Sequence, residues 1–357
     1  MSNSPSSPPP SRPAAPTSPA SDSESASAAT RSDAREAVGP VATLVVGLDI
    51  GGSKTHGALW RGATLVAEAR AGSANVQNVT RDDAAASLAD LFRELLATGP
   101  AGVIGRVVAG SGGVDTAADA DRLRALIAPH APGAVIDVIH DTRLILAAGG
   151  ARAGIAVIAG TGSVAWGVTG EGRQARSGGW GYLLGDEGSG YWVAREAVRR
   201  ALHRHDLGLG PDALDAAVLA LNGVCTPTEL IGLFHSAAGR TYWAAQSRAV
   251  FDAARDGHDD AADILDRAAT DLTRLVLDVA AVIGIPGPVV LGGGLAMHQP
   301  ALQERLRTRF AEEGITDVVF LREDPVMGVR FLMERARHQP AVPPAPKAWL
   351  DSEPPTA

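Results

Sequence analysis

The chain has 357 residues, a formal net charge of −8 and a single cysteine, Cys225. This length allows two domains or one large domain. One cysteine excludes an intrachain disulfide, a cysteine-based zinc site and iron–sulfur ligation within one chain, so a reducing, cytoplasmic location is expected. The acidic balance disfavours a nucleic-acid partner. No uncharged apolar stretch reaches the roughly 18 residues of a membrane span, and the N-terminus lacks a signal-peptide core, so no membrane partner is expected.

Both ends of the chain have the composition of disordered tails. Residues 1–40 are rich in Ser, Pro and Ala and cannot bury enough apolar surface to offset the entropy of ordering. Residues 338–357 form a second, Pro-rich tail. We therefore expect an N-terminal domain over 41–150 and a C-terminal domain over 151–337. A closing helix over 326–337 could pack back on the first domain.

In the first half, hydrophobic periodicity predicts a three-stranded antiparallel meander followed by alternating helices and strands. In chain order, strands are predicted over 41–50, 57–60 and 64–70, a helix over 84–96, a strand over 105–109, a helix over 116–127, a strand over 134–139 and a helix over 142–151.

After Gly154 the pattern starts again. "GIAVIAGTGSVAWGV" (154–168) has the same strand, turn and strand plan as "LVVGLDIGGSKTHGALW" (44–60), which suggests a duplicated fold. The elements predicted next are helices over 188–204, 211–221, 227–237 and 244–284, a strand over 288–294, a helix over 300–313, a strand over 317–321 and a helix over 326–337. Strands alternating with helices of this length indicate an α/β fold with open sheets.

The turn after the first strand carries a candidate phosphate site. It fails the dinucleotide fingerprint, and it fails the P-loop by one residue, because Ser53 follows Gly52 where the P-loop has Lys. Its backbone N–H groups, hydroxyls and lysine can still cradle phosphate oxygens; the residues are Gly51, Gly52, Ser53, Lys54 and Thr55. A carboxylate at Asp49 makes sense there only if a cation such as Mg²⁺ lies between it and the phosphates. The alternative is an ordinary hairpin with a solvated aspartate.

The second hairpin turn offers the same chemistry with Thr161, Gly162 and Ser163. Two such turns, one in each half, could clamp a triphosphate from both sides. Asp141 follows a buried strand and is well placed to act as a general base. The alternative for Asp141 is an N-cap of the following helix, which Asp favours.

Two further glycine-rich segments are candidates for ligand contact. In residues 176–198, glycines beside Trp180 would present backbone next to a flat ring, which suits a sugar; Asp186 could accept hydrogen bonds from sugar hydroxyls. The alternatives are a core tryptophan and a carboxylate at a helix N-terminus. Gly292 and Gly293, which end a buried strand, would let an adenine or ribose lie against the backbone.

Taken in order, these motifs resemble the N-acetylglucosamine kinase branch of the BadF/BadG/BcrA/BcrD ATPase family, within the sugar kinase and actin superfamily. The resemblance covers residues 41–337, and its most specific part is "GGWGYLLGDEGSGYW" (178–192). It implies two actin-like, ribonuclease H-like domains around a nucleotide cleft. It also implies an ATP-dependent amino-sugar kinase that uses Mg²⁺ and phosphorylates the C6 hydroxyl of N-acetylglucosamine, and a homodimer.

The resemblance also assigns roles to single residues. Asp49 would assist Mg²⁺, directly or through water, and Asp141 would be the base. Ser53 and Thr161 would contact phosphates, and Gly292 and Gly293 the adenosine. The sugar side would be formed by Asn75, Asp141, Gly179, Trp180, Gly181 and Asp186. The family's first turn usually reads Asp-Gly-Gly-Gly-Thr, so Ile50 and Ser53 are departures, as is His140 in front of the base.

Several rival functions share some of these motifs. A glucosamine kinase or another hexose-derivative kinase shares all of them. The ATPase that activates 2-hydroxyacyl-CoA dehydratases needs cysteines for an iron–sulfur cluster, which a single Cys225 disfavours. Kinases of the ROK type are disfavoured because their cysteine-rich zinc motif is absent. A sensor that binds ATP and sugar without turnover is disfavoured by the presence of Asp141.

Overall fold

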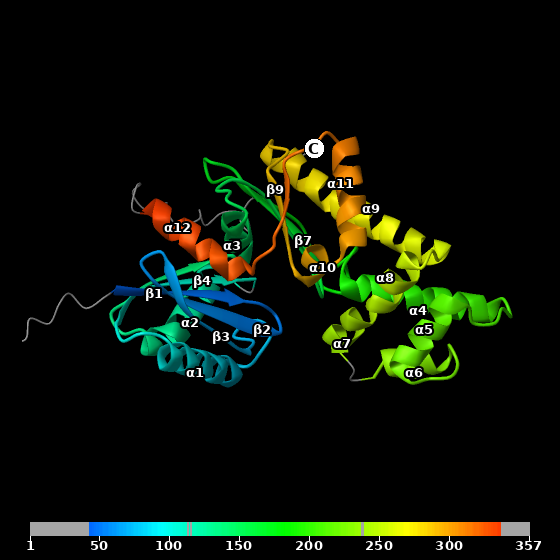
Figure 1. Ribbon diagram of the computed structural model, residues 1–357, viewed down its shortest axis with the longest axis horizontal. Helices are drawn as coiled ribbons and strands as arrows, with labels where there is room; N and C mark the ends of the chain where they lie inside the picture. Colours follow the sequence, from blue (N-terminus) through cyan, green and yellow to red (C-terminus); the bar gives the residue numbers. More distant parts are fainter. Residues whose placement is uncertain (1–42, 113, 115, 237–238, 337–357) are drawn as a thin grey trace, which may run out of the picture. The chain divides into compact units, whose positions relative to one another are not determined.

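The computed structural model describes residues 43–112, 114, 116–236 and 239–336. The two tails expected over 1–40 and 338–357 lie outside these residues. Within them the chain forms two five-stranded sheets flanked by helices (Figure 1), which confirms the α/β class. The domain boundary expected near residue 150 stays a prediction.

The first sheet is built from the first five strands in the order β3-β2-β1-β4-β5. Their bounds are β1 Thr43–Ile50, β2 Lys54–Arg61, β3 Thr64–Gly72, β4 Val103–Ser111 and β5 Val135–Ile139. The first three strands pair antiparallel, as the predicted meander requires, whereas β4 and β5 join parallel to β1. The ends of β1, β4 and β5 therefore lie at the same edge of the sheet.

The second sheet repeats this topology. Its order is β10-β9-β6-β7-β8, where β6, β7 and β8 form the antiparallel meander and β9 and β10 add in parallel. The bounds are β6 Gly154–Ala159, β7 Ser163–Val168, β8 Gln174–Gly178, β9 Val289–Gly292 and β10 Val318–Phe320. The duplication expected from the two hairpins is confirmed at the level of strand order, although β8 was not predicted.

Helices account for most of the described residues outside the strands (Figure 1). Their bounds are α1 Arg81–Thr98, α2 Ala117–Ile127, α3 Asp141–Ala148, α4 Gly190–Asp206, α5 Ala213–Asn222, α6 Glu229–Phe234, α7 Gly239–Gln246, α8 Arg248–Arg255, α9 Asp259–Ile283, α10 Gly294–His298, α11 Pro300–Glu312 and α12 Gly328–Ala336, with 3₁₀ turns η1 at Ala128–His130 and η2 at Pro325–Met327. The short α10 was not predicted.

The single helix predicted over 244–284 is wrong. The structure breaks this region between α7 and α8 and again between α8 and α9. At the first break, the Ser247 hydroxyl donates to the Ala244 carbonyl at 2.7 Å, which competes with the helical hydrogen bond. At the second, Gly257 has a φ of +87°, which ends a helix. Apolar periodicity continues through both breaks, so the pattern does not reveal them.

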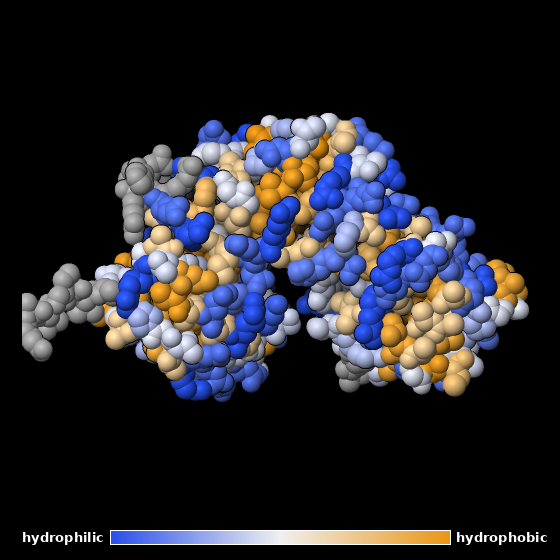
Figure 2. All heavy atoms as spheres, in the orientation of Figure 1, coloured by the Kyte–Doolittle hydropathy of each residue, from blue (hydrophilic) through white to orange (hydrophobic). Residues whose placement is uncertain are grey.

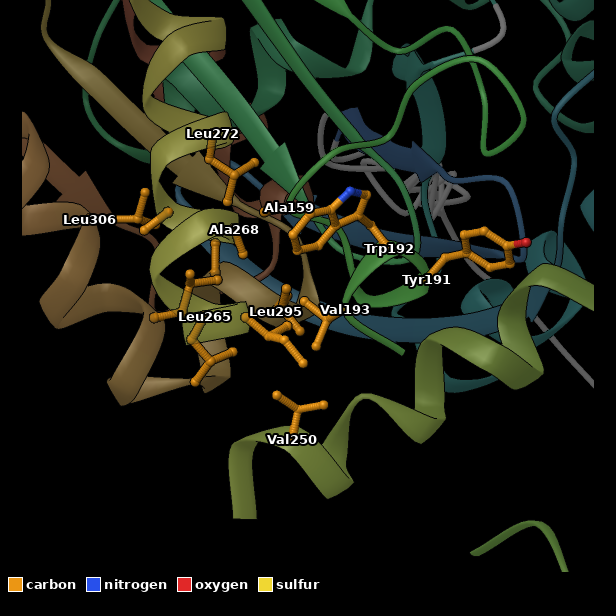
Figure 3. Packing of buried hydrophobic residues seen from close by; sticks show 14 of the residues in the cluster. Ala159, Tyr191, Trp192, Val193, Val250, Leu265, Ala268, Leu272, Leu295 and Leu306 are labelled. Carbon is orange, nitrogen blue, oxygen red and sulfur yellow. The ribbon is translucent and has the colours of Figure 1, made fainter. Parts of the chain in front are cut away.

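Each sheet has its own hydrophobic core. Around the second sheet, side chains of α4 and α9 interlock, and Figure 3 shows Leu265, Ala268 and Leu272 beside Trp192 and Val193. Around the first sheet, Leu44, Val46, Leu48 and Ile50 of β1 face α1 and α2, because alternate residues of a strand point to the same face. The other residues of β1, including Asp49, therefore face the opposite side.

That opposite side is covered by α3 and by the end of the described chain. Val326 and Val329 pack with Trp60 and Leu144 in a small core, and α12 lies beside α3 (Figure 1). The contact is tight, because a side-chain carbon added to Gly328 would lie 2.4 Å from the Leu144 carbonyl oxygen. The last described helix thus helps to cover this face of the first sheet.

The surface in Figure 2 is mostly hydrophilic, with hydrophobic residues gathered over α5 and α6. Among the described residues, none of the helices combines the length and apolar character needed to cross a membrane.

We expect Gly328→Ala to lower the free energy of unfolding by about 1–3 kcal/mol, because the added methyl group must push α12 away from α3. Thermal or urea unfolding measures this. Gly170→Ala is the control, since no atom lies within 4 Å of a side-chain carbon built there. Equal stability of the two variants would show that α12 is not held closely against α3.

Candidate functional site

Asp49 lies near the end of β1, on the sheet face that α3 covers. It pairs with His56 of β2, and Lys54 and His56 share its face because they are two residues apart in the strand. The Asp49 side chain is partly buried. Strand alternation therefore directs this carboxylate away from the main core and toward the residues that follow β5.

The charge on Asp49 is destabilised by its surroundings. Burial, followed by repulsion from Asp141 and Asp324, raises the pKa of the Asp49 carboxyl from 3.8 to about 7, and the nearby Lys54 opposes this only in part. The end of β5 and the segment before η2 thus bring Asp141 and Asp324 within electrostatic reach of Asp49. A cation bound nearby would stabilise the charged form of Asp49.

Asp324 was not singled out from the sequence, although it helps to hold this face together. Its carboxylate accepts a hydrogen bond from Arg70 at 2.6 Å and lies 2.9 Å from the His56 imidazole. These contacts lower the pKa of Asp324 despite its burial, the hydrogen bond from Arg70 being the largest favourable cause. Asp324 is separated by most of the chain from its partners, which explains why no local motif reveals it.

The first hairpin turn presents three of its predicted phosphate-binding residues on the surface. The Gly51 amide donates to the Lys54 carbonyl at 2.9 Å and closes the turn, while Gly52, Ser53 and Lys54 are exposed. A side-chain carbon added to Gly52 would lie 2.7 Å from the side-chain amide nitrogen of Asn78, which would have to move aside. The turn therefore offers backbone, a hydroxyl and an ammonium group.

Thr55 does not fit the predicted phosphate contact. Its side chain is fully buried, and its hydroxyl oxygen accepts the Ala74 N–H at 3.0 Å. This bond ties the hairpin to the segment that carries Asn75. The predicted role is corrected to one of support, because a buried and already bonded hydroxyl is unavailable to a ligand.

Asp141 is the first residue of α3, directly after β5. Its Oδ2 atom would lie 2.8 Å from a side-chain carbon on Gly112, which follows β4. The alternative reading of Asp141 as the N-cap is wrong, since His140 takes that position and accepts the Thr142 N–H. The carboxylate is thus left free of the capping role.

The second hairpin turn is held by hydrogen bonds to α4 and to the segment before it. The Gly190 amide at the start of α4 donates to the Gly160 carbonyl at 2.8 Å. The Ser163 hydroxyl is buried and donates to the Glu187 carbonyl at 2.7 Å, so its predicted phosphate contact is corrected to a supporting role. Thr161 is partly exposed, and Gly162 lies between the two.

The glycines after β9 meet this second turn. A side-chain carbon on Gly160 would approach the Gly293 Cα at 3.8 Å, and one on Gly293 would clash with the Ala159 carbonyl at 2.6 Å. Gly293 has a φ of +90° and leads into α10, whereas Gly292 ends the strand. The structure therefore brings the predicted adenosine-side and phosphate-side turns of the second sheet together.

Asp186 faces the second turn. It is buried, has a φ of +63°, and its Oδ1 accepts the Ser163 N–H at 3.3 Å. A carbon added to Gly162 would lie 2.9 Å from its Oδ2. Burial raises the pKa of the Asp186 carboxyl, against the opposing effect of that hydrogen bond and of Arg240. A strained backbone holding a buried carboxylate is typical of a functional position.

Arg240 of α7 lies between the first turn and Asp186, and it was not singled out from the sequence. Its Nη1 lies 4.0 Å from Asp186, and its Nη2 would lie 3.7 Å from a side-chain carbon on Gly52 of the first turn. A guanidinium beside a glycine turn is a suitable partner for phosphate. The sequence around it has no recognisable motif, so only the fold shows its position.

The remaining predicted sugar residues are divided between the two sheets. Asn75 is buried, and its Oδ1 accepts the Gln77 N–H at 3.0 Å. Gly179 and Gly181 have positive φ values on either side of Trp180, which is 59% exposed beneath the Arg176 guanidinium at 4.3 Å. The alternative of Trp180 as a core residue is therefore wrong.

The described residues include no group of three or more His, Cys, Asp or Glu side chains placed to hold a metal ion. A Mg²⁺ ion that arrives with phosphates keeps most of its waters and uses only one or two protein carboxylates. Asp49, a partly buried carboxylate near the end of β1 and beside the first turn, would supply one of them.

Comparison with known proteins gives consistent results. The sequence profile of the BadF/BadG/BcrA/BcrD ATPase family matches residues 46–328. The chain is 32% identical over 279 residues to an N-acetylmuramic acid/N-acetylglucosamine kinase of Clostridium acetobutylicum, a match that covers 74% of this chain and 89% of the relative. It is 27% identical over 240 residues to an N-acetyl-D-glucosamine kinase of Dictyostelium discoideum, which covers 64% and 75%.

Solved structures share the fold. A candidate N-acetylglucosamine kinase from Chromobacterium violaceum superimposes with a TM-score of 0.66 at 24% identity, covering 82% of this chain and 99% of the other. One from Porphyromonas gingivalis gives a TM-score of 0.67 at 20% identity, with the same coverage.

We expect Asp49→Asn to stabilise the ligand-free protein, and more so at pH 8 than at pH 5. The folded state holds the Asp49 proton up to about pH 7, whereas the unfolded state releases it near pH 3.8, so the wild type loses stability as the pH rises between these values. Removing the charge should recover on the order of 2 kcal/mol at pH 8.

Unfolding in EDTA without nucleotide measures this difference. Asp90→Asn is the control, because Asp90 is an exposed residue of α1 paired with Arg93. A stability difference between Asp49→Asn and the wild type that stays constant from pH 5 to pH 8 would contradict the expectation.

Proposed function

The chain belongs to the BadF/BadG/BcrA/BcrD ATPase family, and on this premise we propose that it is an ATP-dependent kinase of amino sugars, with N-acetylglucosamine as the preferred acceptor and the C6 hydroxyl as the group phosphorylated. The observation that carries the proposal is the interaction of the Asp49 and Asp141 carboxylates beside the first glycine turn. Asp49 is suited to bind the metal ion of a metal-bound triphosphate, and Asp141 is suited to act as the base.

Asp141 serves as the general base. It takes the proton from the sugar hydroxyl while that oxygen forms a bond to the γ-phosphorus and the bond from phosphorus to the ADP oxygen breaks. The products are the sugar phosphate, ADP and a protonated Asp141, which returns its proton to water. Because the reaction needs mainly alignment and charge neutralisation, a correctly placed carboxylate is sufficient as base.

Asp49 would hold Mg²⁺ with ATP, directly or through water. The ion would neutralise charge on the phosphate oxygens. Burial, followed by repulsion from Asp141 and Asp324, raises the pKa of Asp49 in the ligand-free protein, and a neighbouring cation would favour its charged form. Asp49 is thus the residue whose charged form the cation would stabilise.

The phosphates are held by the exposed part of both turns. Gly51, Gly52, Ser53 and Lys54 serve from the first turn, and Thr161 and Gly162 from the second. Arg240 adds a guanidinium that can bind phosphate oxygens from the side of Asp186. Gly292 and Gly293 receive the adenosine.

The sugar lies next to Asp141. Asn75, Gly179, Trp180, Gly181 and Asp186 form its binding side by their match to the family. The Clostridium relative is named for N-acetylmuramic acid as well as N-acetylglucosamine, so both belong in any test of the acceptor. A cytoplasmic homodimer remains our prediction.

The first test is ADP release with Mg²⁺ and a panel of N-acetylglucosamine, N-acetylmuramic acid, glucosamine, N-acetylmannosamine and glucose. We expect sugar-dependent turnover, highest with N-acetylglucosamine. Asp141→Asn should lower kcat by at least about 100-fold and leave ATP affinity nearly unchanged, because it removes only the proton acceptor.

Asp137→Asn is the matched control, since Asp137 lies in β5 and pairs with Arg106 away from the turns. It should keep wild-type kcat. Turnover that is independent of every sugar would refute the kinase proposal, and full activity of Asp141→Asn would remove this residue as the base.

The second test uses Gly112→Ala. The added methyl group would lie 2.8 Å from the Asp141 carboxylate, which can rotate away, so we expect a folded protein with kcat reduced by about 10- to 100-fold. Gly210→Ala, which has open space around it, should behave as wild type. Normal kcat in Gly112→Ala would show that Asp141 need not occupy its observed position.

A further inference from the structure

His140 occupies a position where its side chain contacts both the helix it caps and the residue that follows it. Its Nδ1 atom accepts the Thr142 N–H at 3.3 Å and lies 2.7 Å from the Thr142 hydroxyl. The same nitrogen lies 3.0 Å from the Oδ1 atom of Asp141. N-caps are usually Ser, Thr, Asp or Asn, so a histidine at this position is unusual.

The imidazole also contacts the second sheet. Its centroid lies 3.7 Å from the ring of Trp166, at an interplanar angle of 43°. Trp166 is a buried residue of β7, paired with Ala156 on one side and Arg176 on the other. The backbone of a strand that is paired at both edges is held by hydrogen bonds on both sides. The Trp166 ring therefore starts from a fixed backbone and provides a rigid surface for His140.

The Asp141 carboxylate has little else to fix it. Within the described part of the chain, its buried Oδ1 atom makes no hydrogen bond, and Oδ2 faces the space left open by Gly112. Apart from the 3.0 Å approach of His140 Nδ1 to Oδ1, the side chain is therefore located by packing. The imidazole of His140 is one wall of that contact, and the other is the backbone at Gly112.

We propose that His140 is a positioning residue, which transmits the location of Trp166 in the second sheet to the Asp141 carboxylate that follows the first sheet. The inference rests on the proposed role of Asp141 as base. It makes proton abstraction depend on the contact between the two sheets, so that Asp141 is aligned only when β7 stands beside α3. Neither ring needs to touch ATP or sugar for this role.

The experiment measures kcat and KM for ATP and N-acetylglucosamine in single and double variants. We expect Trp166→Ala to lower kcat by about 10- to 100-fold while both KM values change little, because alignment rather than binding is lost. Trp166→Phe, which keeps an aromatic face, should recover most of kcat. Phe320→Ala is the control, since it removes a ring of the second sheet that faces Arg307 instead.

Two histidine variants separate positioning from capping. His140→Asn keeps a good N-cap but lacks the ring, so it should lose kcat as His140→Ala does. The double variant of His140→Ala with Trp166→Ala should be no worse than either single variant, because both remove the same contact. Full recovery of kcat in His140→Asn, or losses that multiply in the double variant, would overturn the proposal.

Folding is checked by thermal unfolding of each variant. If Trp166→Ala does not fold, Trp166→Leu replaces it with the same expected loss of kcat. A wild type active on sugars with normal kcat in a folded Trp166 variant would contradict only the coupling through Trp166. A wild type inactive on every sugar would instead overturn the proposed function, and this inference with it.

Discussion

The unfavourable surroundings of the Asp49 carboxyl are the constraint on which the site depends. Burial, followed by repulsion from Asp141 and Asp324, raises the pKa of Asp49, so its charged form is destabilised unless a cation lies beside it. The protein maintains this arrangement by placing Asp49 near the end of β1 and Asp141 after β5. The packing of the first sheet, whose core contains neither group, offsets the free energy that this arrangement costs. A site of this kind is prepared for a positively charged ligand before the ligand arrives.

Topology explains why these residues meet. The parallel strands β1, β4 and β5 end at one edge, which brings Asp49, Gly112 and Asp141 together although they come from three separate segments. The second sheet repeats the plan and presents its own glycine turn next to the glycines after β9. Each half thus contributes a turn and a strand end. What differs between the halves is the chemistry: acids in the first, and Arg240 with Asp186 in the second.

Much of this could be predicted from the sequence, because turns, glycines and the acids at strand ends leave local patterns. The site roles of Asp49, Asp141 and both hairpin turns were predicted in this way, and so was the duplication, which the strand order confirms. Burial could not be predicted: Thr55 and Ser163 look like phosphate contacts in the sequence, yet both hydroxyls are bonded inside the protein. Arg240 and Asp324 were missed because their significance comes from distant partners. The breaks between α7, α8 and α9 were missed because apolar spacing persists through them.

The return of the chain to its first sheet has a consequence for biosynthesis. Arg70 and Asp324 are 254 residues apart, and Val329 packs against Trp60 in the small core beside α3. The ribosome releases Val329 long after β1, β2 and α3 have emerged, so α3 alone can cover the face of the first sheet that carries Asp49 during most of translation. The nascent N-terminal half therefore leaves the side of Trp60 that packs on Val326 and Val329 exposed until η2 and α12 have been synthesised.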